Sequence, residues 1–319
     1  LLKVAVRLIA DNPPLCVFWF LSYPFMQIHQ PKHLEVILGN VQHIEKSLAY
    51  TFLHDWLGTG LLTSKGKKWH SHRKMLTPAF HFAILENFVQ VFAKKSEILV
   101  KKLKKNVGPQ SFDIYPYITA CALDIICETA MGVEINAQDQ EKLSDYVEAV
   151  YKITLEVTMR ILSPWLYPDF VFNLFPSGRR FKKYVNVLHS FTEKVIQQRK
   201  KQYASSKASY VSSEDLDLGK KKRMTFLDLL LEAAQNGQNL TDEEIREEVD
   251  TFMFEGHDTT TAAISWTLYL LATHPDIQEK VYEELENIFE NSDRSPSMKD
   301  LSEMKYLERV IKETLRLYP

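Results

Sequence analysis

The sequence predicts a mainly α-helical protein with one small β-sheet near its N-terminus. Over most of the 319 residues, apolar side chains recur every three or four positions, which is the period of an amphipathic helix. Only residues 15–20 and 25–29, separated by Ser22, Tyr23 and Pro24, resemble a short pair of strands. Apolar residues make up 45% of the chain, so a large core can form.

Charge and cysteine usage exclude several classes of protein. The formal net charge of −2 gives no bias toward nucleic acid. Three cysteines at irregular spacing indicate neither a disulfide framework nor a zinc site. Because no linker rich in Gly, Pro or Ser divides the chain, we expect residues 1–319 to form a single domain.

The expected helices follow in order. Residues 31–38 open with Pro31 at a first helical position, where its missing N–H is tolerated. Residues 85–103 place apolar side chains on one face, so a solvated basic face is expected opposite them. The apolar positions are Leu85, Phe88, Phe92, Leu99 and Leu103, and the lysines are Lys94, Lys95, Lys101, Lys102, Lys104 and Lys105. Later helices are expected over residues 181–202, 226–235, 276–290 and 302–317.

Two segments lack a helical period. Residues 162–176 are rich in Trp, Tyr, Phe and Pro, and by residue type alone they could form an irregular plug of the core. Residues 204–222 are polar and mixed in charge, which favours a mobile loop. The basic run at residues 220–223 fits a solvated loop better than a targeting signal or a lipid contact.

A polar island lies inside the longest expected helix. This helix starts after Thr241 with acidic residues in its first turn, and residues 262–271 are so apolar that we expect them to be enclosed on every side. Between them, residues 255–261 read Glu-Gly-His-Asp-Thr-Thr-Thr. At about 100° per residue, one arc of low relief is expected. It holds Glu255, Gly256, Thr259, Ala262 and Ala263.

The island has two interpretations from its residues alone. A glycine in mid-helix costs roughly 1 kcal/mol relative to alanine, and threonine hydroxyls can bond to carbonyls one turn earlier and bend or bulge the helix. Such features open the backbone to a ligand. They also permit a close helix crossing, with Glu255 and Asp258 as structural carboxylates, and local chemistry does not decide between the two.

Three motifs in order resemble those of the cytochrome P450 enzymes. Residues 252–260 resemble the central helix of that family, in the wording of family four, the fatty-acid-hydroxylating branch and its insect relatives. Trp69-x-x-x-Arg73 and Glu313-x-x-Arg316 resemble two further signatures. The resemblance covers essentially the whole chain and implies the cytochrome P450 fold, a helical bundle with a long central helix and a small N-terminal sheet.

The resemblance also implies that parts of the family's domain lie outside these residues. In the family, the cysteine that binds the haem iron follows the Glu-x-x-Arg helix, so we expect it beyond Pro319 and expect no iron ligand within the chain. Cys121 and Cys127 are expected to be buried small hydrophobes, and Cys16 is not expected to bind iron. The longest apolar run, residues 15–21, is shorter than the roughly 20 residues a membrane-spanning helix needs. We therefore expect the family's membrane anchor to precede residue 1.

The resemblance assigns roles around the haem. Arg73 would bind a propionate bidentately and the Trp69 indole would donate a hydrogen bond to it, although by themselves they could be a surface cation–π pair. Glu313 and Arg316 would belong to a buried network holding the thiolate loop, whereas their position outside the helix's apolar arc indicates a surface pair.

The resemblance implies that the polar residues 255–261 take part in the cleavage of dioxygen. Thr259 and Asp258 would relay the protons that dioxygen cleavage requires. Glu255 matches the glutamate that in much of family four forms an ester with a haem methyl group, and Gly256 and Ala263 would line the cofactor beside it. Such an ester would favour attack at the end of a substrate chain.

The implied activity is hydroxylation of a lipophilic substrate, with fatty acids and ω-hydroxylation first and hormones or xenobiotics second. NADPH–cytochrome P450 reductase, cytochrome b5 and a membrane surface are the implied partners, at the cytosolic face of the endoplasmic reticulum. A basic patch could steer the reductase, or could serve solubility alone. It comprises Lys65, Lys67, Lys68, His70, His72 and Lys74. The alternative is a catalytically inert truncated product, or a helical protein that binds apolar ligands or haem.

Overall fold

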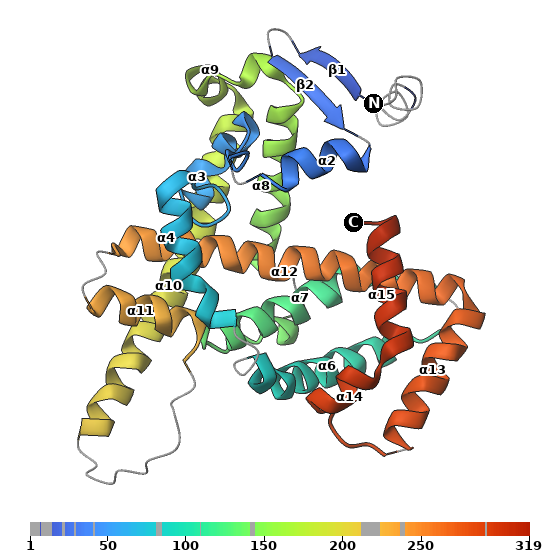
Figure 1. The fold of residues 1–319 in the computed structure, drawn as a ribbon. Coiled ribbons are helices and arrows are strands. Elements are labelled where there is room, and N and C mark those ends of the chain that lie inside the picture. The colour runs from blue at the N-terminus through green and yellow to red at the C-terminus, as the bar shows by residue number, and fades with distance from the viewer. Residues whose placement is uncertain are drawn as a thin grey trace.

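The computed structural model describes residues 7, 15–20, 23–28, 30–40, 42–80, 85–108, 110–140, 144–211, 224–236, 240–290 and 292–319. Helices form most of this structure, and two strands form its one small sheet (Figure 1). The predicted mainly α fold with a small N-terminal sheet is therefore confirmed.

The two strands lie antiparallel. β1 (Leu15–Phe20) has the predicted bounds, and β2 (Tyr23–Ile28) begins earlier than expected, with residue 29 outside the described residues. The register pairs Leu15 with Ile28 and Trp19 with Pro24. Proline is tolerated there because a two-stranded sheet consists of edge strands only. α2 (Pro31–Leu38) follows with its predicted bounds.

The helices after the sheet vary widely in length. The shorter ones are η1 (Leu48–Leu53), α3 (His54–Leu57), α4 (Gly66–Leu76), η2 (Thr77–Phe80), η3 (Glu86–Phe88), η4 (Lys104–Asn106), η5 (Cys127–Met131), η6 (Ala137–Asp139), η7 (Pro164–Leu166), α9 (Asp169–Leu174), α11 (Phe226–Gln235) and α14 (Met298–Glu303). The longer ones are α6 (Val89–Leu103), α7 (Tyr115–Ile126), α8 (Asp145–Ile161), α10 (Pro176–Val211), α12 (Asp242–Thr273), α13 (Pro275–Phe289) and α15 (Lys305–Leu317).

Several predicted bounds were wrong. α10 begins at Pro176 and continues to Val211, so residues 204–211 are helical rather than loop. Ala204, Lys207 and Ala208 are good helix formers, and no Gly or Pro interrupts these residues, so their polar composition does not prevent a helix. The rest of the expected loop, with the basic run at 220–223, lies outside the described residues. The helix expected over residues 302–317 is two helices, because Ser297 and Asp300 form a capping box that starts α14 separately.

Residues 162–176 break the helical period as predicted, and they supply both buried and exposed aromatic side chains. Leu166 and Phe172 are buried, whereas Trp165 and Phe170 are 64% and 73% exposed. The buried Arg160 fixes the segment, because its guanidinium donates to the carbonyls of Leu166 and Tyr167. The segment is thus part core plug and part exposed apolar surface.

α12 crosses the molecule and contacts helices from most of the chain (Figure 1). Its first half is enclosed by the core, in which Val249 and Met253 are fully buried. The expectation that residues 262–271 are also enclosed was wrong, since Ile264 is 44% and Tyr269 is 55% exposed. An apolar sequence indicates that a face should be covered, but α13 and α15 cover only part of this half. No described helix combines the length and apolar composition needed to span a membrane.

The basic face expected on α6 contains one exception. Lys95 is only 1% exposed, and its ammonium lies 2.9 Å from the carboxylate of Glu128. A buried lysine is tolerated because this ion pair offsets the cost of removing the charge from water. The helical pattern of residues 85–103 could not predict this burial, because Glu128 belongs to η5, which follows α7.

Replacing Lys95 with alanine should therefore destabilise the protein by about 3 kcal/mol, because Glu128 would lose its closest cation. Lys101→Ala, an exposed lysine on the same helix, is the control and should change the stability by less than about 0.5 kcal/mol. Urea unfolding of the two variants would measure both effects. Equal stabilities would show that the buried pair contributes nothing.

Candidate functional site

The middle of α12 carries the polar island as one continuous helix. Thr241 and Glu244 form a capping box at its start, as the sequence indicated. The hydroxyls of Thr259, Thr260 and Thr261 donate to the carbonyls of Glu255, Gly256 and His257 at 2.7, 2.7 and 2.6 Å. The predicted bonding to the preceding turn is confirmed. The helix is nevertheless not interrupted, so these bonds produce no bulge.

Two carboxyl groups of the island are partly buried. Burial raises the pKa of Glu255. The charge of Glu248 raises this pKa further, and the charge of Lys46 offsets part of the increase. Burial likewise raises the pKa of Asp258, and His257 offsets part of that shift. Both groups therefore hold a proton at higher pH than free carboxyls do. This property suits an acid that donates protons near neutrality.

Gly256 supports the helix-packing interpretation. A Cβ atom at this position would lie 2.6 Å from Cδ1 of Ile126, so glycine leaves room for the side chain that α7 packs against α12. Glu255, Ala262 and Ala263 remain partly exposed, and Thr259 is exposed. Gly256 therefore faces α7, whereas Glu255, Thr259, Ala262 and Ala263 form a stripe that remains open to solvent.

His257, between Gly256 and Asp258, is fully buried. Its Nδ1 lies 2.6 Å from the Met253 carbonyl, an acceptor, so Nδ1 carries the hydrogen. Burial lowers its pKa, which keeps the ring neutral. Its Nε2 has no hydrogen-bond partner within the described part of the chain. No sequence signal could have identified this, because burial depends on the helices packed around α12.

Trp69 and Arg73 lie one turn apart on α4, as predicted. Trp69 is partly buried, and its ring meets the edge of His70 at 5.1 Å between centroids. Arg73 is exposed, and its guanidinium pairs with no carboxylate of the described residues. An indole N–H and a guanidinium fork on neighbouring turns form a site suited to carboxylates.

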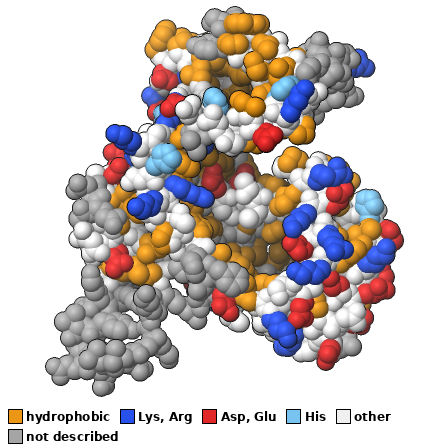
Figure 2. All heavy atoms as spheres, in the orientation of Figure 1, with side chains coloured by type: hydrophobic (Ala, Val, Ile, Leu, Met, Phe, Trp, Pro, Cys, Tyr) orange, Lys and Arg blue, Asp and Glu red, His pale blue; other side chains and the backbone are white. Residues whose placement is uncertain are grey.

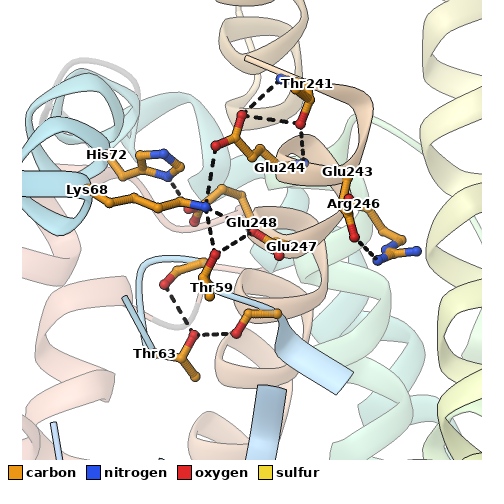
Figure 3. Close-up of polar contacts among 12 residues, drawn as sticks. Thr59, Thr63, Lys68, His72, Thr241, Glu243, Glu244, Arg246, Glu247 and Glu248 are labelled. Carbon is orange, nitrogen blue, oxygen red and sulfur yellow. Dashed lines mark hydrogen bonds and ion pairs between the residues drawn. The ribbon is translucent and has the colours of Figure 1, made fainter. Parts of the chain in front are cut away.

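Part of the expected basic patch is internal (Figure 3). His72 Nδ1 lies 2.6 Å from Glu248, and Lys68 lies 3.3 Å from both Glu244 and Glu247 on α12. These two side chains bind the protein itself and do not belong to a free basic surface. The sequence could not show this, because their partners lie in a distant part of the chain. Lys67, His70 and Lys74 are exposed, as is Lys65, which is 3.6 Å from Glu45.

Glu313 and Arg316 form a bidentate pair on α15, with distances of 2.8 and 2.7 Å. Their side chains are 57% and 66% exposed, which matches a surface pair within these residues. Beside them, a groove of about 360 Å³ lies between the end of α12 and α15 and is lined by Leu270, Val310 and Thr314 among others. Glu313 therefore borders a largely apolar recess.

The three thiols are buried and poorly suited to bind iron. Burial raises the pKa of Cys121 to about 12, and it raises that of the fully buried Cys127 further. A thiolate is the form that binds a metal ion. The expectation that Cys121 and Cys127 serve as buried hydrophobes is confirmed by their burial.

The family model described as Cytochrome P450 matches residues 4–319. The chain belongs to the cytochrome P450 family. Cytochrome P450 4c21 of Blattella germanica is 54% identical over 306 residues, 96% of this chain and 61% of that protein.

Two further relatives carry the same family number. Cytochrome P450 4c3 of Drosophila melanogaster is 48% identical over 308 residues, 94% of this chain and 57% of that protein. Cytochrome P450 4V2 of Homo sapiens is 48% identical over 307 residues, 96% of this chain and 58% of that protein. The chain thus spans 57 to 61% of the length of these relatives, and its resemblance to family four is confirmed.

The cofactor of the cytochrome P450 family is haem b, and the open residues of this chain fit it in part. Figure 2 shows the face that carries α4 and α15 hollowed in its middle. The unpaired guanidinium of Arg73 and the indole of Trp69 match the two carboxylates of a haem. The stripe of Glu255, Thr259 and Ala263 has the low relief that a flat ring requires. The described residues thus offer one wall and a carboxylate-binding pair.

A second buried carboxyl lies two turns before Asp258 on α12. Asp250 is 1% exposed, and burial raises its pKa to about 8, which Thr192 and Arg246 offset only partly. His189 Nε2 lies 3.5 Å from it, and burial lowers the pKa of that histidine. The sequence showed Asp250 as one more acid in an acidic helix.

Asp250 should make stability depend on pH. Between about pH 4 and 8 the folded state keeps a proton that the unfolded chain releases, so stability falls as pH rises through this window. Asp250→Asn should flatten this slope by up to about 1.4 kcal/mol per pH unit. Urea unfolding across the window measures it, with the exposed Asp242→Asn as control. Parallel slopes for Asp250→Asn and the parent would contradict the assigned pKa.

Proposed function

We propose that this chain is part of a haem-thiolate monooxygenase that hydroxylates lipophilic substrates. The observation that carries the proposal is the open stripe of Glu255 and Thr259, with the raised-pKa acid Asp258 beside it, on a chain that also offers the unpaired Arg73 and Trp69. This chemistry needs an acid that can supply protons beside the cofactor and side chains that can bind the carboxylates of the cofactor, and the chain offers both. When bound, haem supplies the activation of dioxygen at an iron held by a cysteine thiolate.

The residues of this chain would bind the cofactor and move protons. Arg73 and Trp69 bind and orient its carboxylates. Burial raises the pKa of Asp258, so this carboxyl keeps its proton to a higher pH than a free one, and the exposed hydroxyl of Thr259 would pass a proton toward the open side of α12. Ala263 keeps the stripe flat. Glu313 and Arg316 would be covered by the part of the domain that holds the thiolate.

We further propose fatty acids as the leading substrates, with hydroxylation at or near the ω carbon. Support comes from Glu255, whose partly buried carboxyl could form an ester with the cofactor and hold it rigidly. A rigid cofactor in a narrow site favours the slim end of an alkyl chain. Hormones and xenobiotics are the second class of substrate.

The proposed partners are NADPH–cytochrome P450 reductase, with cytochrome b5 as a second electron donor, at the cytosolic face of the endoplasmic reticulum. The exposed Lys67, His70 and Lys74 support docking of an acidic protein. Contact with a membrane surface is supported by large exposed apolar side chains, among them Trp19, Met26, Trp165 and Phe170.

Product analysis tests the proposal directly. The full-length protein, supplied with reductase, NADPH and a panel of fatty acids, should yield ω-hydroxylated products and show a thiolate-type spectrum with carbon monoxide after reduction. The alternative is an inert haem- or ligand-binding product. It predicts neither product nor that spectrum.

Thr259→Ala should uncouple turnover in the full-length enzyme by at least about tenfold, because the proton path loses its hydroxyl while haem still binds. Oxidation of NADPH should continue as hydrogen peroxide replaces product. Thr260→Ala is a matched control, since that hydroxyl makes the same bond to the preceding turn but lies about 100° around the helix. If both variants stay coupled, Thr259 has no part in proton transfer.

Glu255→Gln should leave all the haem extractable by acidic organic solvent, because an amide cannot form the ester although it keeps the size of the side chain. The parent should retain at least part of its haem covalently, as mass spectrometry of the intact protein would show. Equal extraction from both proteins would refute the ester and leave the role of Thr259 untouched.

A further inference from the structure

The first turns of α12 hold α4 through two buried side chains (Figure 3). His72 is 7% exposed and Glu248 is fully buried. Because a carboxylate only accepts, His72 Nδ1 donates to its Oε1 at 2.6 Å. The other oxygen accepts from the backbone N–H of Leu61 at 3.2 Å. Glu248 therefore ties both α4 and the loop before it to α12.

Lys68 provides a second attachment one turn earlier on α4. Its ammonium donates to the Thr59 hydroxyl at 2.7 Å and to Glu247 at 3.3 Å. The loop itself lies against α12, because a Cβ atom at Gly60 would be 2.8 Å from the Glu247 carbonyl oxygen. Two attachments at positions i and i+4 fix both the location and the rotation of α4 about its axis.

The rotation of α4 decides where Trp69 and Arg73 point. Each follows an attached residue directly, Trp69 after Lys68 and Arg73 after His72. Each is therefore displaced by about 100° from the attached face. On α12, Glu255 lies seven residues after Glu248 and so within about 20° of it around the axis. The same rigid helix thus carries the attachment of α4 and the open stripe.

A buried hydrogen-bonded pair of polar side chains adds little stability, but it specifies geometry. Apolar residues of similar size often stabilise as much, whereas a hydrogen-bonded pair allows a single arrangement. An apolar contact would let α4 turn or slide along α12. A turn of α4 would move the Arg73 guanidinium even though Arg73 contacts no group in the attachment.

We propose that His72 and Glu248 are positioning residues that hold the Arg73 guanidinium and the Trp69 indole in place to bind the carboxylates of haem. The inference rests on the proposed function, because it takes Arg73 and Trp69 as that binding pair. It adds two residues whose effect on the cofactor passes through α4.

The test measures how fast haem leaves the full-length holoprotein for an excess of apomyoglobin. His72→Leu should release haem about tenfold faster, the change that loss of one charge-assisted hydrogen bond produces. His72→Gln, which still offers a donor to Glu248, should restore most of the retention. His43→Leu, an exposed histidine outside the attachment, is the control and should release haem at the parental rate.

A double-mutant cycle separates positioning from a general loss of structure. Arg73→Leu alone should speed haem loss, and adding His72→Leu to it should change the rate by clearly less than the tenfold expected in the parent, because the guanidinium is already gone and only the Trp69 contact is left to lose. If the two substitutions speed haem loss by factors that simply multiply in the double variant, the proposal is overturned. If Arg73→Leu does not affect haem loss, the assignment of the binding pair fails instead.

Should His72→Leu fail to fold, Glu248→Gln replaces it in the cycle, since the amide keeps the size of the side chain and an acceptor oxygen while removing the charge. The same non-additivity with Arg73→Leu is then expected. Thermal unfolding of each variant is recorded alongside. Faster haem loss that follows the fall in melting temperature in every variant, the rescue variant included, would reduce His72 to a structural residue.

Discussion

The close crossing of α7 and α12 at Gly256 is the contact on which the rest of the site depends. A Cβ atom there would lie 2.6 Å from Cδ1 and 2.7 Å from Cγ1 of Ile126, so any larger residue would have to displace the Ile126 side chain that α7 packs against α12. The crossing costs roughly 1 kcal/mol of helix propensity, and it determines which side of α12 is buried. His257 then faces the core and Thr259 faces outward. Helix packing and ligand access, which looked like alternatives in the sequence, are two consequences of one crossing.

The same burial sets the chemistry of the ionisable groups along α12. Carboxyls at the boundary between core and open side, Glu255 and Asp258, have raised pKa values because they are only partly solvated. Further inside, burial raises the pKa of Asp250 to about 8 and lowers the pKa of His257. At the start of the helix, Glu248 is fully buried and bound by His72. The same helix therefore carries carboxyl groups with raised pKa values and, in Glu248, a carboxyl group that binds α4.

Much of the fold could be predicted from local patterns. Residues 31–38 and 226–235 were predicted with the bounds observed, because Pro31 marks one start and amphipathic spacing marks the other. The motifs placed Trp69, Arg73 and Thr259 by resemblance. Contacts between distant segments could not be predicted: Lys95 and His72 look like ordinary surface cations, and the partner of His72 lies 176 residues away. The exposed second half of α12 was missed for a similar reason, since an apolar run does not tell which elements cover it.

A crystal structure of the full-length, haem-loaded protein tests the central claim most directly. We predict that one face of the haem lies on the stripe of Glu255, Thr259 and Ala263, with its carboxylates bound by Arg73 and Trp69 and with His72 still bound to Glu248. A haem that lies elsewhere, or whose carboxylates bind neither Arg73 nor Trp69, would contradict the account.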